Sequence, residues 1–411
     1  SWWRISRELR VSFSSDGKGW LARCRIAVKL RLVKYLFLFA CLLSVLRLEG
    51  AVRVATYNVS FNSREYPDLS AALEGGEEKK MHQVAKVIRM VRPEVILLAE
   101  FDLTQKEDGV VDEAAMQKKV DAFRKNYLEV KQQGLETIRY EHALWMPTNT
   151  GVPSGLDLNR NGKVGEPSDA WGYGEQNGQF GFVLLSQHPI ARDEVRSFRK
   201  FLWADMPGNL CPVDYHGEKL AAKLRLSSKT HLDVPVTIDG KTVHLLLCHP
   251  TPPSFDGKED RNGRRNFDEI RLWADYLDPA RSGYLKDDLG KVGGLVEGAA
   301  FVILGDLNAD PLDGDSREKD GVKAIDQLLK HPLVLGDIAP TSKGAGEQVK
   351  KRQRPETKTA AFKLRVDYVL PSKAHFKIAD SGVFWPMKRD ENYPLIRASD
   401  HRMVWVDLEF R

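Results

Sequence analysis

From residue 52 onward, short apolar runs typical of buried strands alternate with stretches whose apolar residues recur at helical spacing. Runs rich in β-branched and aromatic residues predict strands at 53–60, 95–100, 181–186, 242–249, 301–306, 366–371, 379–385 and 403–410. Helical spacing predicts helices at 77–90, about 112–130 and about 265–278. No internal repeat or long linker interrupts the pattern. We therefore expect one domain over 52–411, of the α/β (α+β) class, with sheets packed face to face and helices outside.

The N-terminal segment has a different pattern. A cluster of basic residues precedes an uncharged apolar run of twelve residues at 35–46. Twelve helical residues rise about 18 Å, which is too short for a bilayer core of roughly 30 Å. We therefore predict a non-structural N-terminus over 1–51 that contains a signal peptide at about 23–51, and an exported protein that is periplasmic, secreted or on the cell surface. The alternatives are a core helix or an uncleaved membrane anchor, which would be the chain's only contact with a membrane.

The basic excess belongs to that segment. The formal net charge is +5, but residues 1–50 hold ten Lys/Arg and three Asp/Glu, which leaves 52 Lys/Arg against 54 Asp/Glu in the remainder. The body therefore has no bulk electrostatic signature of a nucleic-acid-binding protein. Only Cys211 and Cys248 lie outside the N-terminal segment, and no CxxC pair exists, so we expect buried free thiols rather than a cysteine-bound zinc.

Polar residues follow the predicted strands where each strand ends. Side chains at strand ends can converge on one edge of a rigid scaffold while the strands stay buried. Amide and carboxylate oxygens are hard ligands that suit magnesium, manganese or calcium. Taken singly, each residue also has an ordinary explanation as a turn former, a helix cap or a surface charge. The residues are Asn58, Glu100, His249, Asp306, Asn308, Asp400 and His401.

Six segments, in this order, resemble the motifs of the endonuclease/exonuclease/phosphatase superfamily, which shares the pancreatic deoxyribonuclease fold. They are TYNVS, LLAEFD, LLLCHPTPP, ILGDLNADP, RVDYVLPS and ASDHRMVWV, spread over essentially all of 52–411. The resemblance implies a four-layer sandwich of two mixed β-sheets flanked by helices. It also implies hydrolysis of phosphodiesters or phosphomonoesters with a bound divalent cation.

The resemblance implies a metal site for Mg2+ or Mn2+ at Asn58, Glu100 and Asp400, with Glu100 as the direct ligand. A cation that touches a phosphoryl oxygen offsets the negative charge that develops there.

The same resemblance implies catalytic roles for five further residues. Asp306 would position or deprotonate the attacking water, and Asn308 would hold a phosphate oxygen. His401 would be the phosphate-binding or base histidine, and His249 would protonate the leaving group. Asp367 would orient His249 or raise its basicity.

The segment that corresponds to an Arg- or Tyr-bearing strand in many relatives departs from that pattern. Here Gln179 occupies the approach to the strand, and Tyr173 lies a few residues earlier. Arg264 and Arg265, together with Arg261, are therefore candidates for contacting a substrate phosphate. The alternative is solvated charge at the start of a helix. Lys229 and His231 are further candidates for facing the site.

A second metal site is predicted at residues 157–169. Asp157, Asn159 and Asn161 place oxygen ligands at alternate positions before Gly162, as in the first half of an EF-hand-like loop. The acid expected at the end arrives one residue late, at Asp169. The hypothesis is a separate Ca2+ site, and the alternative is a Gly/Asn-rich surface loop.

The sequence thus predicts an exported phosphodiesterase or nuclease-type hydrolase that acts on a small phosphodiester or nucleic acid and needs no stable protein partner. The alternative is a non-catalytic, calcium-stabilised surface or binding protein on the same fold. The nucleophile-elbow spacing GxSxG and a P-loop are both missing from the sequence, which argues against serine hydrolysis and P-loop chemistry.

Overall fold

Two mixed sheets carry the apolar strands in the computed structural model, which describes residues 50–132 and 134–411. The first sheet has six strands in the order β12-β13-β1-β2-β4-β3. Its strands are β1 (Val52–Phe61), β2 (Val95–Phe101), β3 (His142–Trp145), β4 (Phe182–Ser186), β12 (Phe376–Val383) and β13 (Val404–Phe410). β1 is parallel to β2, and the other neighbours are antiparallel.

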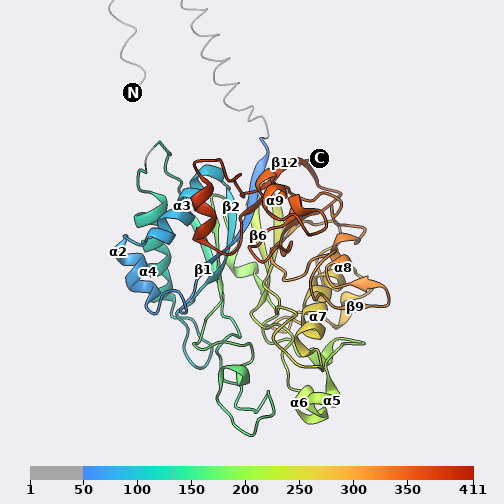
Figure 1. Cartoon of the computed structure of the whole chain (residues 1–411). Coiled ribbons are helices and arrows are strands. Elements are labelled where there is room, and N and C mark those ends of the chain that lie inside the picture. The colour runs from blue at the N-terminus through green and yellow to red at the C-terminus, as the bar shows by residue number, and fades with distance from the viewer. Residues whose placement is uncertain (1–49, 133) are drawn as a thin grey trace, which may run out of the picture. The chain divides into compact units, whose positions relative to one another are not determined.

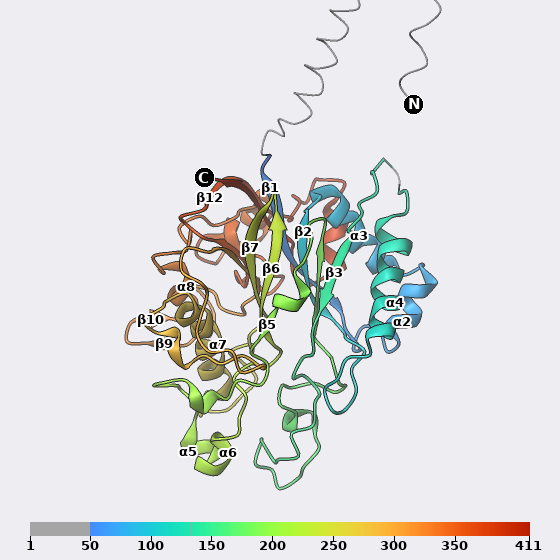
Figure 2. The same ribbon diagram turned by 180° about the vertical axis from the view of Figure 1, so that it is seen from behind.

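The second sheet has five strands in the order β11-β8-β7-β6-β5, of which only β7 and β8 are parallel. Its strands are β5 (Arg196–Ser197), β6 (His231–Ile238), β7 (Lys241–Cys248), β8 (Ala300–Asp306) and β11 (Asp367–Pro371). Figure 2 shows this sheet from behind, with β6 and β7 in view. A separate small hairpin consists of β9 (Glu318–Lys319) and β10 (Val322–Lys323).

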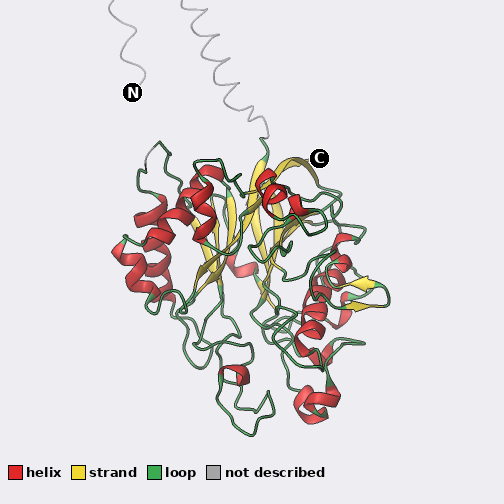
Figure 3. Cartoon of the chain, in the orientation of Figure 1, coloured by secondary structure: helices red, strands yellow, loops and turns green. Residues whose placement is uncertain are grey.

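Three apolar clusters hold four layers together. Because side chains alternate across a strand, each sheet has one face toward the other sheet and one face toward helices. Between the sheets, Val54, Leu97, Leu247 and Leu304 are buried in one cluster. The outer face of the first sheet packs on α2 (Leu69–Gly75), α3 (Lys79–Val91) and α4 (Glu113–Phe123), and that of the second on α7 (Arg261–Tyr276) and α8 (Asp326–Leu329). Figures 1 and 3 show the helices outside the strands on both sides, which confirms the expected four-layer sandwich.

The three predicted helices form with shifted ends. α3 ends where Arg92 adopts a left-handed backbone (φ 56°) and donates its N–H to Ile88, just before Pro93. α4 is capped by the Asp112 side chain and continues as one π-helical turn, Arg124–Leu128. α7 begins at Arg261, ahead of the predicted start.

The remaining helices are short and were not predicted, because too few apolar residues recur in them to show a period. They are α2, α8, α5 (Val213–His216), α6 (Glu218–Ala221), α9 (Lys343–Gln348) and 3-10 turns at Pro167–Asp169, Arg192–Glu194, Trp203–Asp205, Ser282–Tyr284, Pro355–Thr357 and Tyr393–Ala398.

Strand β6 also escaped prediction because of Pro235, a residue that central strands disfavour. β5 pairs only with Leu232 and Asp233, so Pro235 lies beyond it on the open side of β6. The carbonyl of Pro235 accepts the N–H of Ala191 on that side, so the pairing with β7 loses no hydrogen bond to the proline.

Residues Ala51–Arg411 form one compact unit. Within residues 50–132 and 134–411, no helix has the length and apolar character needed to cross a membrane. The predicted signal peptide lies outside the described residues. Cys211 and Cys248 are buried free thiols, as expected.

Candidate active site

The two sheets meet at the side chain of Asn58, near the end of β1. Its amide Nδ2 donates to Glu100 Oε1 (3.0 Å) at the end of β2 and to Asp306 Oδ2 (3.2 Å) at the end of β8. Asn58 is fully buried, and Asn62 Nδ2 donates to the second oxygen of Glu100 at 2.8 Å. One amide therefore fixes the spacing of two carboxylates that come from different sheets.

Unusual backbone geometry orients several side chains of the site. Glu100 and Asn308 both have left-handed backbones, with φ of 55° and 51°, which a non-glycine residue adopts only at a cost in free energy. A Cβ on Gly305 would lie 1.9 Å from the carbonyl oxygen of Cys248, so only glycine lets β8 run this close to β7 before Asp306. The close packing of β8 against β7 thus explains why the GD motif has a glycine.

Asp306 is the hub of the site. Its Oδ1 accepts the backbone N–H of Asn308 at 3.1 Å, while its Oδ2 lies 3.5 Å from His249 Nε2 and 3.6 Å from His401 Nε2. Burial raises the pKa of Asp306 to about 7, although the neighbouring His401 opposes that rise. A carboxylate with such a pKa can gain or lose a proton near neutral pH.

Asp367 pairs with His401, so the predicted pairing of Asp367 with His249 is wrong. His401 Nδ1 lies 3.1 Å and 3.0 Å from the two oxygens of Asp367, which is the direct cross-strand neighbour of Asp306. Thr359 Oγ1 donates to Asp367 at 2.7 Å and fixes the carboxylate. Burial by itself lowers the pKa of His401, but Asp367 and then Asp306 outweigh burial and raise the pKa to about 10. His401 is therefore an imidazolium at neutral pH.

His249 is neutral by contrast. Burial, followed by the positive charges of Lys229 and His401, holds the pKa of His249 well below its usual range. Its Nε2 faces Asp306, whereas its buried Nδ1 has no hydrogen-bond partner within the described part of the chain.

Asp400 lies at the exposed rim of the site. It accepts a hydrogen bond from Ser60 Oγ at 3.1 Å. Ser399 Oγ donates to the carbonyl of Asn58 at 2.7 Å and accepts the N–H of His401 at 3.0 Å. The SDH segment is therefore tied to the end of β1, which explains why these distant motifs lie together.

Two overlapping groups of donors could hold a cation. Donor atoms of Asp306, Asp367 and His401 lie within 4.8 Å of one another. Both oxygens of Asp367 already pair with His401 and Thr359, however, so this group suits an oriented imidazole better than a metal. Glu100 and Asp306 offer hard carboxylate oxygens beside the amide of Asn58, and that set fits a small divalent cation.

Tyr173 lies at the rim of the site, and Gln179 supports that rim from within the protein. Tyr173 is half exposed, and its hydroxyl accepts from Arg64. Gln179 is fully buried, donates to Ser63 Oγ and accepts the N–H of Glu175, so both ends of its amide are used within the protein. The prediction that Gln179 contacts a substrate phosphate is contradicted by these bonds.

Arg265 has a structural role, and its predicted phosphate contact stays a prediction. Its guanidinium donates at 2.8 Å to each of three backbone carbonyls, those of Leu226, Trp171 and Arg225, and so ties two loops to α7. Arg264, half buried, stays a candidate.

His231 does not face the site either. Its Nδ1 pairs with Ser227 Oγ and its Nε2 with the carbonyl of Glu269, beside the ring of Trp273 in the core.

Side chains of the predicted calcium loop form hydrogen bonds with one another and with the loop backbone. Glu166 Oε2 accepts from the amides of both Asn159 and Asn161, and Asp157 accepts the N–H groups of Asn161 and Gly162. Asp169 has another role, because its two oxygens accept the backbone N–H groups of Leu158 and Glu166. Glu166, three residues earlier, is thus the acid that faces the loop.

Several supporting residues were missed by sequence reasoning. Glu269 on α7 is fully buried and accepts from the N–H groups of Ser228 and Thr251, which flank the site segments. Asp102 accepts the N–H groups of Ser63 and Phe180, and burial raises the pKa of Asp102 to about 7. The sequence offers no signal for Glu269, whereas Asp102 stands inside the quoted LLAEFD motif.

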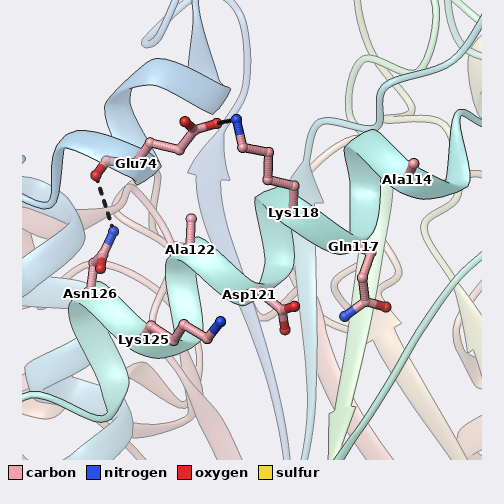
Figure 4. A pocket seen from close by; sticks show the side chains of 8 residues that line it. All are labelled: Glu74, Ala114, Gln117, Lys118, Asp121, Ala122, Lys125 and Asn126. Atoms are coloured by element: carbon pink, nitrogen blue, oxygen red, sulfur yellow. Dashed lines mark hydrogen bonds and ion pairs between the residues drawn. The ribbon is translucent and has the colours of Figure 1, made fainter.

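An open surface pocket of about 650 Å³ lies elsewhere, between α2 and α4 (Figure 4). Lys118 there pairs with Glu74, and Asn126 donates to the Glu74 carbonyl. None of its lining residues belongs to the site, so it has no evident part in the chemistry of the strand ends.

The chain thus forms a two-sheet sandwich in which carboxylate and imidazole side chains cluster at the strand ends. The model of the Endonuclease/Exonuclease/phosphatase family matches residues 55–401. The chain belongs to that family, as the motifs predicted.

A comparison with solved structures finds chains of similar fold. One is an endonuclease/exonuclease/phosphatase from Beutenbergia cavernae, 17% identical over 88% of this chain and 72% of that chain (TM-score 0.47). A family member from Leptotrichia buccalis is 16% identical over 88% and 100% (TM-score 0.46). The beta toxin of Staphylococcus aureus, with bound magnesium ions, is 13% identical over 87% and 100% (TM-score 0.42). No curated protein matches the chain. The family assignment rests on the family model.

The hydrogen bonds of Arg265 predict a structural role. Replacing Arg265 with Met should lower the free energy of unfolding by about 2–4 kcal/mol, because three backbone carbonyls lose their donor. Denaturant titration measures the loss. Arg264→Met is the matched control and should lose less, since no hydrogen bond of its side chain is seen in the described residues. A fully stable Arg265→Met protein would contradict the structural role.

Proposed function

We propose that this protein hydrolyses phosphoester bonds with a divalent cation, as a phosphodiesterase or nuclease-type enzyme. The observation that carries the proposal is the amide of Asn58, which brings Glu100 and Asp306 together from two sheets beside the Asp367–His401 pair. A substrate with a phosphate group suits a site that combines carboxylates with an imidazolium.

The cation would be Mg2+ or Mn2+, held by Glu100, with Asp306 as its neighbour and the Asn58 amide as the group that spaces the two carboxylates. A bound cation supplies Lewis-acid stabilisation of charge on a phosphoryl oxygen. Asp400, at the rim beside Ser60, remains a proposed further ligand or orienting carboxylate.

The protonation states suggest a division of labour. Asp306 has a pKa suited to accepting a proton from an attacking water near neutral pH. His401 already carries a proton that Asp367 stabilises, so it acts as a phosphate-binding cation and not as the base. Asn308, whose Nδ2 is held at 3.1 Å from the Pro250 carbonyl, is proposed to orient a phosphate oxygen.

His249 is the proposed proton donor to the leaving group. Its low pKa leaves it neutral before substrate binds. Negative charge on a bound phosphate would favour the charged imidazole and raise that pKa, which is the condition that the role requires.

The proposal predicts metal-dependent hydrolysis of bis-p-nitrophenyl phosphate or plasmid DNA. The purified chain should act with magnesium or manganese, and EDTA should abolish turnover. Asp306→Asn and His401→Ala should each lower kcat by at least ~100-fold, the scale of losing a positioned acid–base or charge-stabilising group. Rates are measured on samples with matched melting curves.

Asp193→Asn is the control for loss of a carboxylate, because Asp193 is exposed next to the segment that pairs with Val236, at the opposite end of the second sheet. It should keep the wild-type rate. Wild-type turnover in both site variants would remove the proposed roles. Activity that survives EDTA would remove the metal. A chain that binds calcium but hydrolyses no phosphoester would favour the non-catalytic alternative.

We also propose that the loop of Asp157, Asn159, Asn161 and Glu166 binds Ca2+. Millimolar calcium should then raise Tm, because the ion binds only the folded loop. Asp157→Asn should remove the increase without changing Tm in EDTA by more than a few degrees. Equal calcium responses in the wild type and this variant would rule the loop out.

Export is proposed from the basic and apolar N-terminal segment alone. Expressed with its first 51 residues, the chain should be recovered outside the cytoplasm and shortened at its N-terminus. Recovery of the full-length chain in the cytoplasmic fraction would contradict export.

A further inference from the structure

Lys229 lies at the same edge of the second sheet as the proposed catalytic groups. It precedes β6, whose His231 pairs with Cys248, so the register places Lys229 alongside the segment that follows His249. Its carbonyl accepts the N–H of Asn149, in the loop that follows β3 of the first sheet. The backbone at Lys229 is therefore fixed by both halves of the sandwich.

The side chain of Lys229 is largely buried. The residue is 6% exposed, and Nζ forms no hydrogen bond or ion pair with any residue that the structure describes. Other buried lysines differ: Lys119 Nζ donates to the Asp102 carbonyl at 3.0 Å, and Lys358 Nζ pairs with Asp310 at 2.8 Å. An ammonium on a largely buried side chain that forms no bond with the protein is available to a ligand.

The charges around Lys229 are those of the site. Burial lowers the pKa of Lys229, while Glu269, Glu100 and Asp306 act in the opposite direction. Its own charge in turn depresses the pKa of His249. The ammonium is therefore within electrostatic reach of both the carboxylates and the imidazole of the site.

Glu269 does not neutralise Lys229 by direct contact. Its Oε1 accepts from the N–H and hydroxyl of Ser228, and its Oε2 accepts the N–H of Thr251. The carboxylate thus fixes the segments on either side of Lys229 and His249, and leaves the ammonium available to a ligand.

We propose that Lys229 is a catalytic residue that binds a non-bridging oxygen of the substrate phosphate and stabilises the charge that develops there. This inference rests on the proposed hydrolysis. It assigns to Lys229 the contact that Gln179 cannot make, because the amide of Gln179 is fully buried and bonded within the protein. A compact point charge at a fixed position can favour the transition state over the ground state.

The test replaces Lys229 with Met, which keeps the length of the side chain and removes the charge. kcat on bis-p-nitrophenyl phosphate should fall at least ~100-fold, the scale of one lost charge-stabilising donor. The inhibition constant for inorganic phosphate, in magnesium, should rise at least ~10-fold. Tm should stay equal or increase, because the substitution breaks no bond with the protein and removes the cost of desolvating a charged side chain that is largely buried. Lys119→Met, the matched buried lysine that has a partner, should lower Tm.

A purely structural Lys229 would give the reverse pattern, with a lower Tm and unchanged phosphate inhibition, and that outcome overturns the inference. If Lys229→Met does not fold, Lys229→Gln provides the same readouts with a polar, uncharged side chain. Should the wild type hydrolyse no phosphoester, the proposed hydrolysis fails separately. Inorganic phosphate would then be tested by thermal shift, and equal shifts in the wild type and Lys229→Met would overturn the role of Lys229.

Discussion

The site depends on one buried amide. Asn58 donates to Glu100 from its own sheet and to Asp306 from the other sheet, so the distance between the sheets and the spacing of the two carboxylates are set together. Two carboxylates held this close would repel each other in water and more strongly in a buried site. The amide hydrogens of Asn58 and the adjacent His401 imidazolium each reduce that repulsion. The apolar core between the sheets supplies the rigidity that a loop could not, because close packing resists small displacements.

The closeness of the charged side chains also determines the pKa values of His401 and Asp306. Asp367 and Asp306 both act on His401, and together they keep it protonated in spite of burial. His401, in turn, limits how far burial raises the pKa of Asp306. The imidazole of His401 therefore keeps its proton, while the pKa of the Asp306 carboxylate lies near neutral pH. The two groups acquire different roles from their different environments. Thr359 contributes by fixing the Asp367 carboxylate that determines this balance.

The site residues at the strand ends could be predicted, because each of them is marked by the residues next to it in the sequence. Asn58, Glu100, Asp306 and His401 each stand next to an apolar run, and the order of the motifs along the chain relates them to one another. The partner of Asp367 could not be predicted, because β11 pairs with β8 over a long sequence separation and only that register places the carboxylate at His401. Strand β6 could not be predicted for the same reason. Pro235 is tolerated in β6 because the neighbouring strand β5 is too short to pair with it, and the sequence does not show that pairing.

The basic residues show why charge in a sequence is a weak guide to a ligand. Arg265 and Lys229 are both cationic, yet they differ in how they are bound within the protein. The planar guanidinium of Arg265 donates from Nε and Nη2 to three backbone carbonyls. The ammonium of Lys229 lies at the end of a strand whose neighbouring carbonyls are paired with other backbone groups, and the nearest buried carboxylate, Glu269, is occupied by Ser228 and Thr251. Because side-chain bonds of this kind arise from tertiary contacts, the sequence alone does not show which basic residues are bound within the protein.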